Sequence, residues 1–178
     1  MMHDEILSIF PEINEIKDAD LRGKTAAAWA SAMKRSTLSY DDLRSMPFTL
    51  LVSDVNVTFV EHVRTVAKMC MACWDVLDKS YGSRNKVNRD ILISGAMLAD
   101  VGKVLEFTKK DGKFVKSEHG KLLRHPFSGV GICWEHGLPD EVTHVVAMHS
   151  KEAAGGKRTP EGIVLHHADF IDFELVGG

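Results

Sequence analysis

Apolar residues spaced three and four apart dominate the middle of this chain, and they restrict it to a helical fold. In residues 56–79 this spacing produces one apolar stripe, as an amphipathic helix requires. The stripe consists of Val60, Val63, Val66, Ala67, Cys70, Trp74 and Leu77. Residues 90–107 are apolar on most sides, which is typical of a helix buried at the centre of a bundle. The predicted fold class is therefore all-α.

Glycine and proline divide the rest of the chain into shorter pieces. Further helices are predicted at about residues 121–135, 139–149 and 159–175. Trp74 and Trp134 lie on apolar faces and are expected in the core.

A polar loop or small hairpin is expected at residues 109–116 (KKDGKFVK), around Asp111 and Gly112. The first fifty residues are expected to form short helices broken by Pro11, Gly23 and Pro47. We expect residues 1–50 to be an N-terminal helical extension packed on residues 51–178, so that the chain is a single globular unit.

Composition narrows the classes of function. The 178 residues, 44% hydrophobic and 26% charged, suit one globular domain. A net charge of −3 disfavours a broad nucleic-acid surface, and no apolar run reaches the roughly 18–20 residues that span a bilayer. The acidic start, MMHDEILSIF, disfavours a signal peptide.

We expect a cytoplasmic protein with a small-molecule substrate, and whether it forms a homo-oligomer stays open. Its three cysteines are expected to be reduced thiols.

Asp100 is the most unusual residue of the chain. It lies in GAMLADVGK, near the end of the predicted central helix. A buried carboxylate is normally paired, protonated or bound to a metal. Lys103, three residues later, could pair with it. Histidines and a second carboxylate in an apolar stretch offer another answer, because together they suit Zn, Mn or Fe. These candidate metal ligands are His62, Asp100, His125, His149 and Asp169.

The order of these residues resembles the pattern H … HD … H … H … D of the HD superfamily of metal-dependent hydrolases. LADVGK is similar to the family's LHDIGK, and RHPFSGVGI is similar to its RHPxxG stretch. The HxxD formed by His166 and Asp169 resembles the last metal-binding helix of the family. The resemblance covers residues 56–175, about two-thirds of the chain, and implies an HD-domain-like helical bundle.

The resemblance also implies roles for individual residues. His62, Asp100 and Asp169 would hold a first metal, and Asp100 would bridge to a second one held by His125 and His149. One or two divalent ions (Mn, Fe or Zn) are thus expected per chain, with a metal-bound hydroxide as the nucleophile.

Lys103 and Asp100 are the predicted catalytic residues. Lys103 would stabilise negative charge that develops on the substrate, or it would simply pair with Asp100. His119, Arg124 and Lys151 are predicted to bind an anionic group of the substrate, unless they merely face water.

Ala99 departs from the family pattern, because it stands where the family has its namesake histidine. The first site could be vacated, leaving a mononuclear centre at Asp100, His125 and His149. It could instead be rebuilt with water, His166 or His167. A third interpretation is that alanine was introduced to inactivate the enzyme.

The function predicted from these motifs is metal-dependent hydrolysis of a small molecule, at a phosphoester or an activated carbonyl. Three alternatives stay open. They are a hydrolase that opens a non-phosphate ring or a C–C bond, a di-iron oxygenase built on the same ligands, and a non-catalytic ligand-binding variant.

Overall fold

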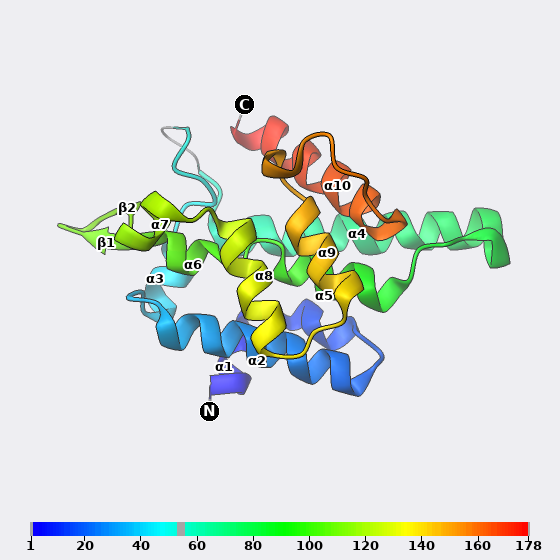
Figure 1. Ribbon diagram of the computed structural model, residues 1–178, viewed down its shortest axis with the longest axis horizontal. Helices are drawn as coiled ribbons and strands as arrows, with labels where there is room; N and C mark the ends of the chain where they lie inside the picture. Colours follow the sequence, from blue (N-terminus) through cyan, green and yellow to red (C-terminus); the bar gives the residue numbers. More distant parts are fainter. Residues whose placement is uncertain (1, 53–55, 178) are drawn as a thin grey trace.

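The computed structural model describes residues 2–52 and 56–177. In that part of the chain helices predominate, and one two-stranded hairpin accompanies them (Figure 1). The predicted all-α class is confirmed. The order of elements is α1 (Met2–Ile9), η1 (Pro11–Glu15), α2 (Ala19–Arg35), α3 (Tyr40–Ser45), α4 (Phe59–Tyr81), η2 (Gly82–Arg84), α5 (Arg89–Leu98), α6 (Lys103–Glu106), β1 (Phe107–Lys110), β2 (Lys113–Lys116), α7 (Glu118–Leu122), α8 (His125–Glu135), α9 (Asp140–Met148), η3 (Lys151–Ala153) and α10 (Pro160–Gly177).

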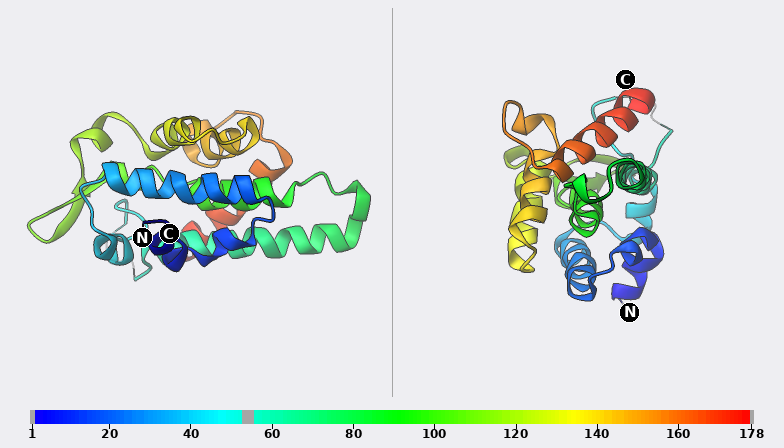
Figure 2. Two further views of the ribbon diagram at one scale, coloured as in Figure 1. Left: turned by 90° about the horizontal axis from the view of Figure 1, so that it is seen from below. Right: turned by 90° about the vertical axis from the view of Figure 1, so that its right-hand side faces the viewer.

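Helix α5 is the central element, as its apolar sequence predicts. It packs against α2 and η1 on one side and against α4, α9 and α10 on the other (Figures 1 and 2). Asn88 starts it, because its side chain accepts hydrogen bonds from the amides of Asp90 and Ile91. Helix α4 starts at a capping box between Thr58 and Glu61.

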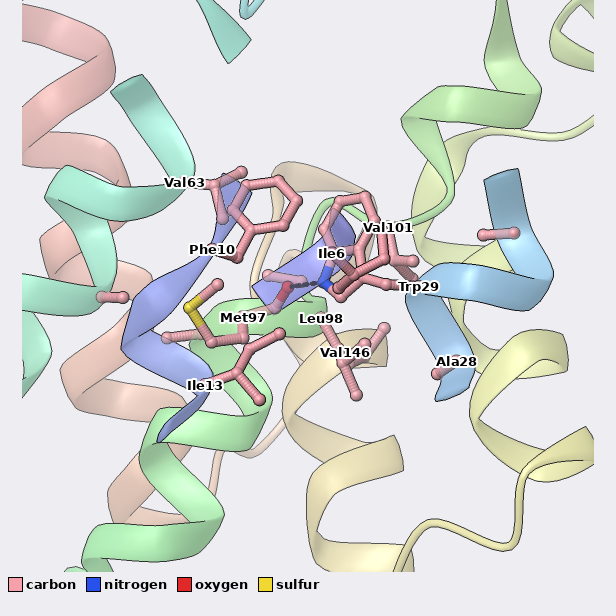
Figure 3. Packing of buried hydrophobic residues seen from close by; sticks show 14 of the residues in the cluster. Ile6, Phe10, Ile13, Ala28, Trp29, Val63, Met97, Leu98, Val101 and Val146 are labelled. Carbon is pink, nitrogen blue, oxygen red and sulfur yellow. Dashed lines mark hydrogen bonds between the residues drawn. The ribbon is translucent and has the colours of Figure 1, made fainter. Parts of the chain in front are cut away.

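The core centres on Trp29 of α2, which is fully buried (Figure 3). Its ring packs 4.5 Å, centroid to centroid, from the ring of Phe10. Its indole Nε1 donates a hydrogen bond of 2.8 Å to the carbonyl of Met97 at the end of α5.

One hydrophobic cluster joins residues before and after residue 51, so the N-terminal helices pack directly on the remainder. The boundary at residue 50 stays a prediction.

Two expectations about the helices are wrong. Gly23 does not break a helix, because α2 runs through it from a cap at Asp18 and buries Leu21 and Thr25 on its inner face. Trp134 is 72% exposed rather than in the core. Helix α8 turns the neighbouring Ile132 and Cys133 inward, which leaves Trp134 on the outer side.

The predicted central helix is also shorter than expected. Helix α5 ends at Leu98, and a turn at residues 99–102 separates it from α6. The backbone of Gly102 lies against that of His125, so closely that a Cβ atom would fall 2.2 Å from the His125 carbonyl oxygen. This close contact holds the turn, and Asp100 within it, against the start of α8.

The helix predicted at residues 121–135 is divided into α7 and α8 at residues 123–124, whereas the hairpin and the free cysteines agree with the prediction. The hairpin forms at residues 107–116, with positive φ angles at Asp111 (51°) and Gly112 (77°), as an Asp-Gly turn requires. Cys70, Cys73 and Cys133 are free thiols. Among the described residues, no helix is both long and apolar enough to cross a bilayer.

We predict that Gly102→Ala destabilises the protein by about 1–3 kcal/mol, because the new methyl group meets backbone that cannot move away easily. Gly131→Ala is the matched control, since nothing lies within 4 Å of a Cβ at this helical position. Urea unfolding of both variants measures the effect. Equal stability of the two variants would contradict the role given to Gly102.

Candidate metal centre

The predicted metal ligands come together at one buried site, although they belong to five different segments. His62 lies on α4, Asp100 in the turn after α5, His125 at the start of α8, His149 at the end of α9 and Asp169 on α10. Their ligand atoms form two groups, in each of which all atoms lie within 4.8 Å of one another. We call Asp100, His125 and His149 the two-histidine group, and His62, Asp100 and Asp169 the one-histidine group.

Asp100 belongs to both groups, and its two oxygens face different ones. Its Oδ1 lies 3.2 Å from Nε2 of His125 and 3.7 Å from Nε2 of His149. Its Oδ2 lies 3.2 Å from Nε2 of His62, which is also 3.2 Å from Oδ1 of Asp169. The residue is only 4% exposed. The carboxylate therefore lies between the two groups of candidate ligands and contributes one oxygen to each.

The other ring nitrogen of each histidine contacts an acceptor. Nδ1 of His62 lies 2.6 Å from Oδ2 of Asp172, and Nδ1 of His125 lies 3.1 Å from Oε2 of Glu106. Nδ1 of His149 lies 2.8 Å from the carbonyl of Val146. Because these acceptors fix the proton on Nδ1, they leave Nε2 available to a metal ion. The donor set thus fits a divalent transition ion.

Charges at the site are strongly coupled. Burial alone would raise the pKa of Asp100, but the Lys103 ammonium and hydrogen bonds from His149 and His62 hold it well below its ordinary value. Burial works against a charged His62 ring, yet Asp100, Asp169 and Asp172 raise its pKa to about 10. Without a metal, this ring carries a second proton at neutral pH, and an ion in the one-histidine group must displace it.

In the two-histidine group the pKa values of the two imidazoles shift in opposite directions. It lowers the pKa of His125, against the opposing effects of Glu106 and Asp100. For His149 the hydrogen bond to Asp100 outweighs burial, and the pKa is raised. His125 is therefore a neutral ligand near pH 7, as metal binding requires.

Lys103 pairs with Asp100, which is one of the two roles considered for it. Its Nζ lies 2.8 Å from Oδ2 of Asp100 and donates a further hydrogen bond of 2.9 Å to the carbonyl of Phe48. It also lines a cavity of about 160 Å³ that opens onto the two groups. An ammonium has three donors, so one remains for another acceptor.

Only two of the three predicted substrate-binding residues line this cavity. Arg124 and Lys151 line it. His119 lies in a different groove beside the hairpin, where its Nε2 is 2.7 Å from the hydroxyl of Ser128. The cavity also has an apolar wall, formed by Leu50, Leu51, Phe107, Phe170 and Phe173.

Ala99 is buried in the hydrophobic cluster. The neighbours considered as replacement ligands do not join either group. Nδ1 of His166 lies 2.7 Å from the carbonyl of His149, and His167 is exposed. The one-histidine group therefore has three protein ligands among the described residues.

Two residues of the site were missed by sequence reasoning. Glu106 is fully buried, and it accepts hydrogen bonds from the amide of His125 and from Nη1 of Arg124, the latter 2.5 Å long. Asp172 binds His62. Each is an acidic residue between apolar neighbours, Leu105 and Phe107 or Ile171 and Phe173, and this is the signal that singled out Asp100.

Fold and site together define an all-α protein with a buried His/Asp cluster that could hold metal ions. The chain is similar to dihydroneopterin 2′,3′-cyclic phosphate phosphodiesterase of Methanocaldococcus jannaschii, with 32% identity over 120 residues. The match covers 65% of this chain and 46% of that protein, so the chain spans less than half of the relative's length. No protein-family model matches the chain, and no solved structure matches it.

We predict that Glu106→Gln weakens divalent-ion binding about 10–100-fold, because His125 loses the charged partner that orients it. Isothermal titration with Mn²⁺ measures this change. Glu118→Gln is the control, since that carboxylate is 89% exposed and pairs with Lys121 on the surface. An unchanged affinity in the Glu106 variant would contradict the positioning role.

Proposed function

We propose that this protein is a metal-dependent phosphodiesterase of the HD type that hydrolyses a small phosphodiester, in particular a cyclic phosphate. The observation that carries the proposal is the buried Asp100 carboxylate, whose two oxygens face two groups of candidate metal ligands. The similarity to a cyclic phosphate phosphodiesterase supports the choice of reaction.

His62, Asp100, His125, His149 and Asp169 would hold the metal. A bound divalent ion supplies a hydroxide at neutral pH and polarises a phosphoryl oxygen. The net reaction adds water across one P–O bond, so that a cyclic diester opens to a monoester and a free hydroxyl group. Glu106 and Asp172 hold the rings of His125 and His62 in position through Nδ1, so that Nε2 of each ring faces Asp100.

The cavity has the features that an anionic, partly apolar substrate would need. Lys103 lines it beside Asp100 and has one donor left for a phosphoryl oxygen. Arg124 is held by Glu106 and Glu152 through Nη1 and Nε. Lys151 adds an exposed positive charge. The apolar wall offers Phe170 and Phe173 to a ring system.

The direct test is hydrolysis of dihydroneopterin 2′,3′-cyclic phosphate and of simpler 2′,3′-cyclic phosphates by the purified chain. We expect turnover with Mn²⁺ or Fe²⁺, loss of turnover with EDTA, and equal rates with and without oxygen, because hydrolysis consumes only water. Absence of phosphomonoester product with every ion tested would refute the proposal. A requirement for oxygen would favour the oxygenase instead.

We predict that Lys151→Gln raises KM about 2–5-fold with little change in kcat, as expected for one exposed charge that attracts an anion. Lys157→Gln is the matched control, because Lys157 is an exposed lysine of the same loop that does not line the cavity. The difference between the variants should shrink at high salt. Equal KM values at low salt would exclude Lys151 from substrate binding.

A further inference from the structure

The two ligand groups differ in a way that bears on how many ions the site holds. We propose that the chain binds one divalent ion, in the two-histidine group, and that the Lys103 ammonium takes the place of a second ion beside Oδ2 of Asp100. This inference rests on the metal use in the proposed function, but it does not depend on which bond is hydrolysed.

The two-histidine group presents two buried imidazoles to a cation. Oδ1 of Asp100 lies 3.2 Å from Nε2 of His125 and 3.7 Å from Nε2 of His149. Both rings are buried, and each has its Nδ1 against an acceptor of a fully buried residue, Glu106 or Val146. Two imidazoles and one carboxylate form a set that binds ions such as Fe²⁺.

Oδ2 of Asp100, in contrast, already has a cationic partner. Lys103 Nζ lies 2.8 Å from it, closer than Nε2 of His62 at 3.2 Å. An ion bound through Oδ2 would have to share this oxygen with an ammonium group, and like charges at such separations repel strongly at a buried site.

Lys103 is also fixed in position. Its side chain is 12% exposed, and it donates to the carbonyl of Phe48. Its Nζ lies 6.0 Å from the ring centroid of Phe48 and 5.8 Å from that of Phe59, within the range of cation–π attraction. Moving the ammonium away from Asp100 would break these contacts together.

Ala99 completes the asymmetry. The one-histidine group has no nitrogen ligand besides His62 among the described residues, because His166 and His167 do not join it. An alanine at position 99, which offers no ligand, and the ammonium of Lys103 act in the same direction, since both leave this group weaker as a cation site. The site thus has a metal-binding half and a half in which lysine supplies the positive charge.

In a rival arrangement, the single ion would lie in the one-histidine group instead of the two-histidine group. Asp100 and Asp169 are both carboxylates, so their negative charge would attract a hard ion to the one-histidine group if Lys103 could be displaced. Ligand variants distinguish the two arrangements, because each group has ligands that the other lacks.

Counting bound ions tests the proposal. Purified protein is dialysed against Mn²⁺, the ions per chain are measured by elemental analysis, and the affinity is measured by calorimetry. We expect one ion in the unchanged chain. His149→Ala should lose it, with affinity more than about 100-fold lower, a larger loss than that caused by removing an outer partner. Asp169→Asn should keep one ion, with affinity changed less than about threefold, the scale of a nearby charge.

Lys103→Met is the decisive variant, because it frees Oδ2 of Asp100. We expect it to bind two ions, and the double variant Lys103→Met/Asp169→Asn to return to one. Thermal melts check that each variant is folded. If His149→Ala does not fold, the numbers of ions bound by Lys103→Met and by Lys103→Met/Asp169→Asn decide between the two arrangements.

Four results would overturn the proposal: two ions in the unchanged chain, only one ion in folded Lys103→Met, loss of the ion in Asp169→Asn but not in His149→Ala, or no ion at all. The first three would leave the proposed hydrolysis intact if turnover is observed. If the chain binds one ion and the variants give the expected counts, but no phosphodiesterase activity is found, only the proposed function would be overturned.

Discussion

The buried carboxylate of Asp100 is the constraint on which this structure depends. A carboxylate that is 4% exposed must be compensated, and here the compensation comes from four directions. His62, His125 and His149 approach from α4, α8 and the end of α9, and Lys103 approaches from the start of α6. Because α5 ends at Leu98, Asp100 lies in the turn where these groups meet. The turn that carries Asp100 is held by the contact between Gly102 and the backbone of His125.

Much of the fold could be predicted from the sequence, because helical periodicity is a local property. The stripe on α4 and the Asp-Gly turn of the hairpin are examples. The end of α5 could not be predicted, because it depends on a contact between segments twenty-three residues apart, Gly102 and His125. Trp134 shows the same limit. Its apolar side chain indicates burial, but the packing of α8 decides which face of the helix points inward.

The candidate site was predicted only in part. Residue order identified the five candidate ligands, and the structure brings them together. The partners that orient the rings, Glu106 and Asp172, were not identified, because a hydrogen bond to Nδ1 leaves no spacing pattern in the sequence. The pairing of Lys103 with Asp100 was one of two interpretations, and the structure combines it with a place at the cavity. The meaning of Ala99 for metal binding depends on Lys103, because the lysine places a positive charge beside the group that lacks a second imidazole.

Crystals grown with Mn²⁺ would reveal whether this buried cluster is a metal centre. We expect an anomalous difference peak at Asp100, within coordination distance of its carboxylate and of Nε2 of His125 and His149. A map with Mn²⁺ bound elsewhere on the chain and no peak at Asp100 would contradict this expectation.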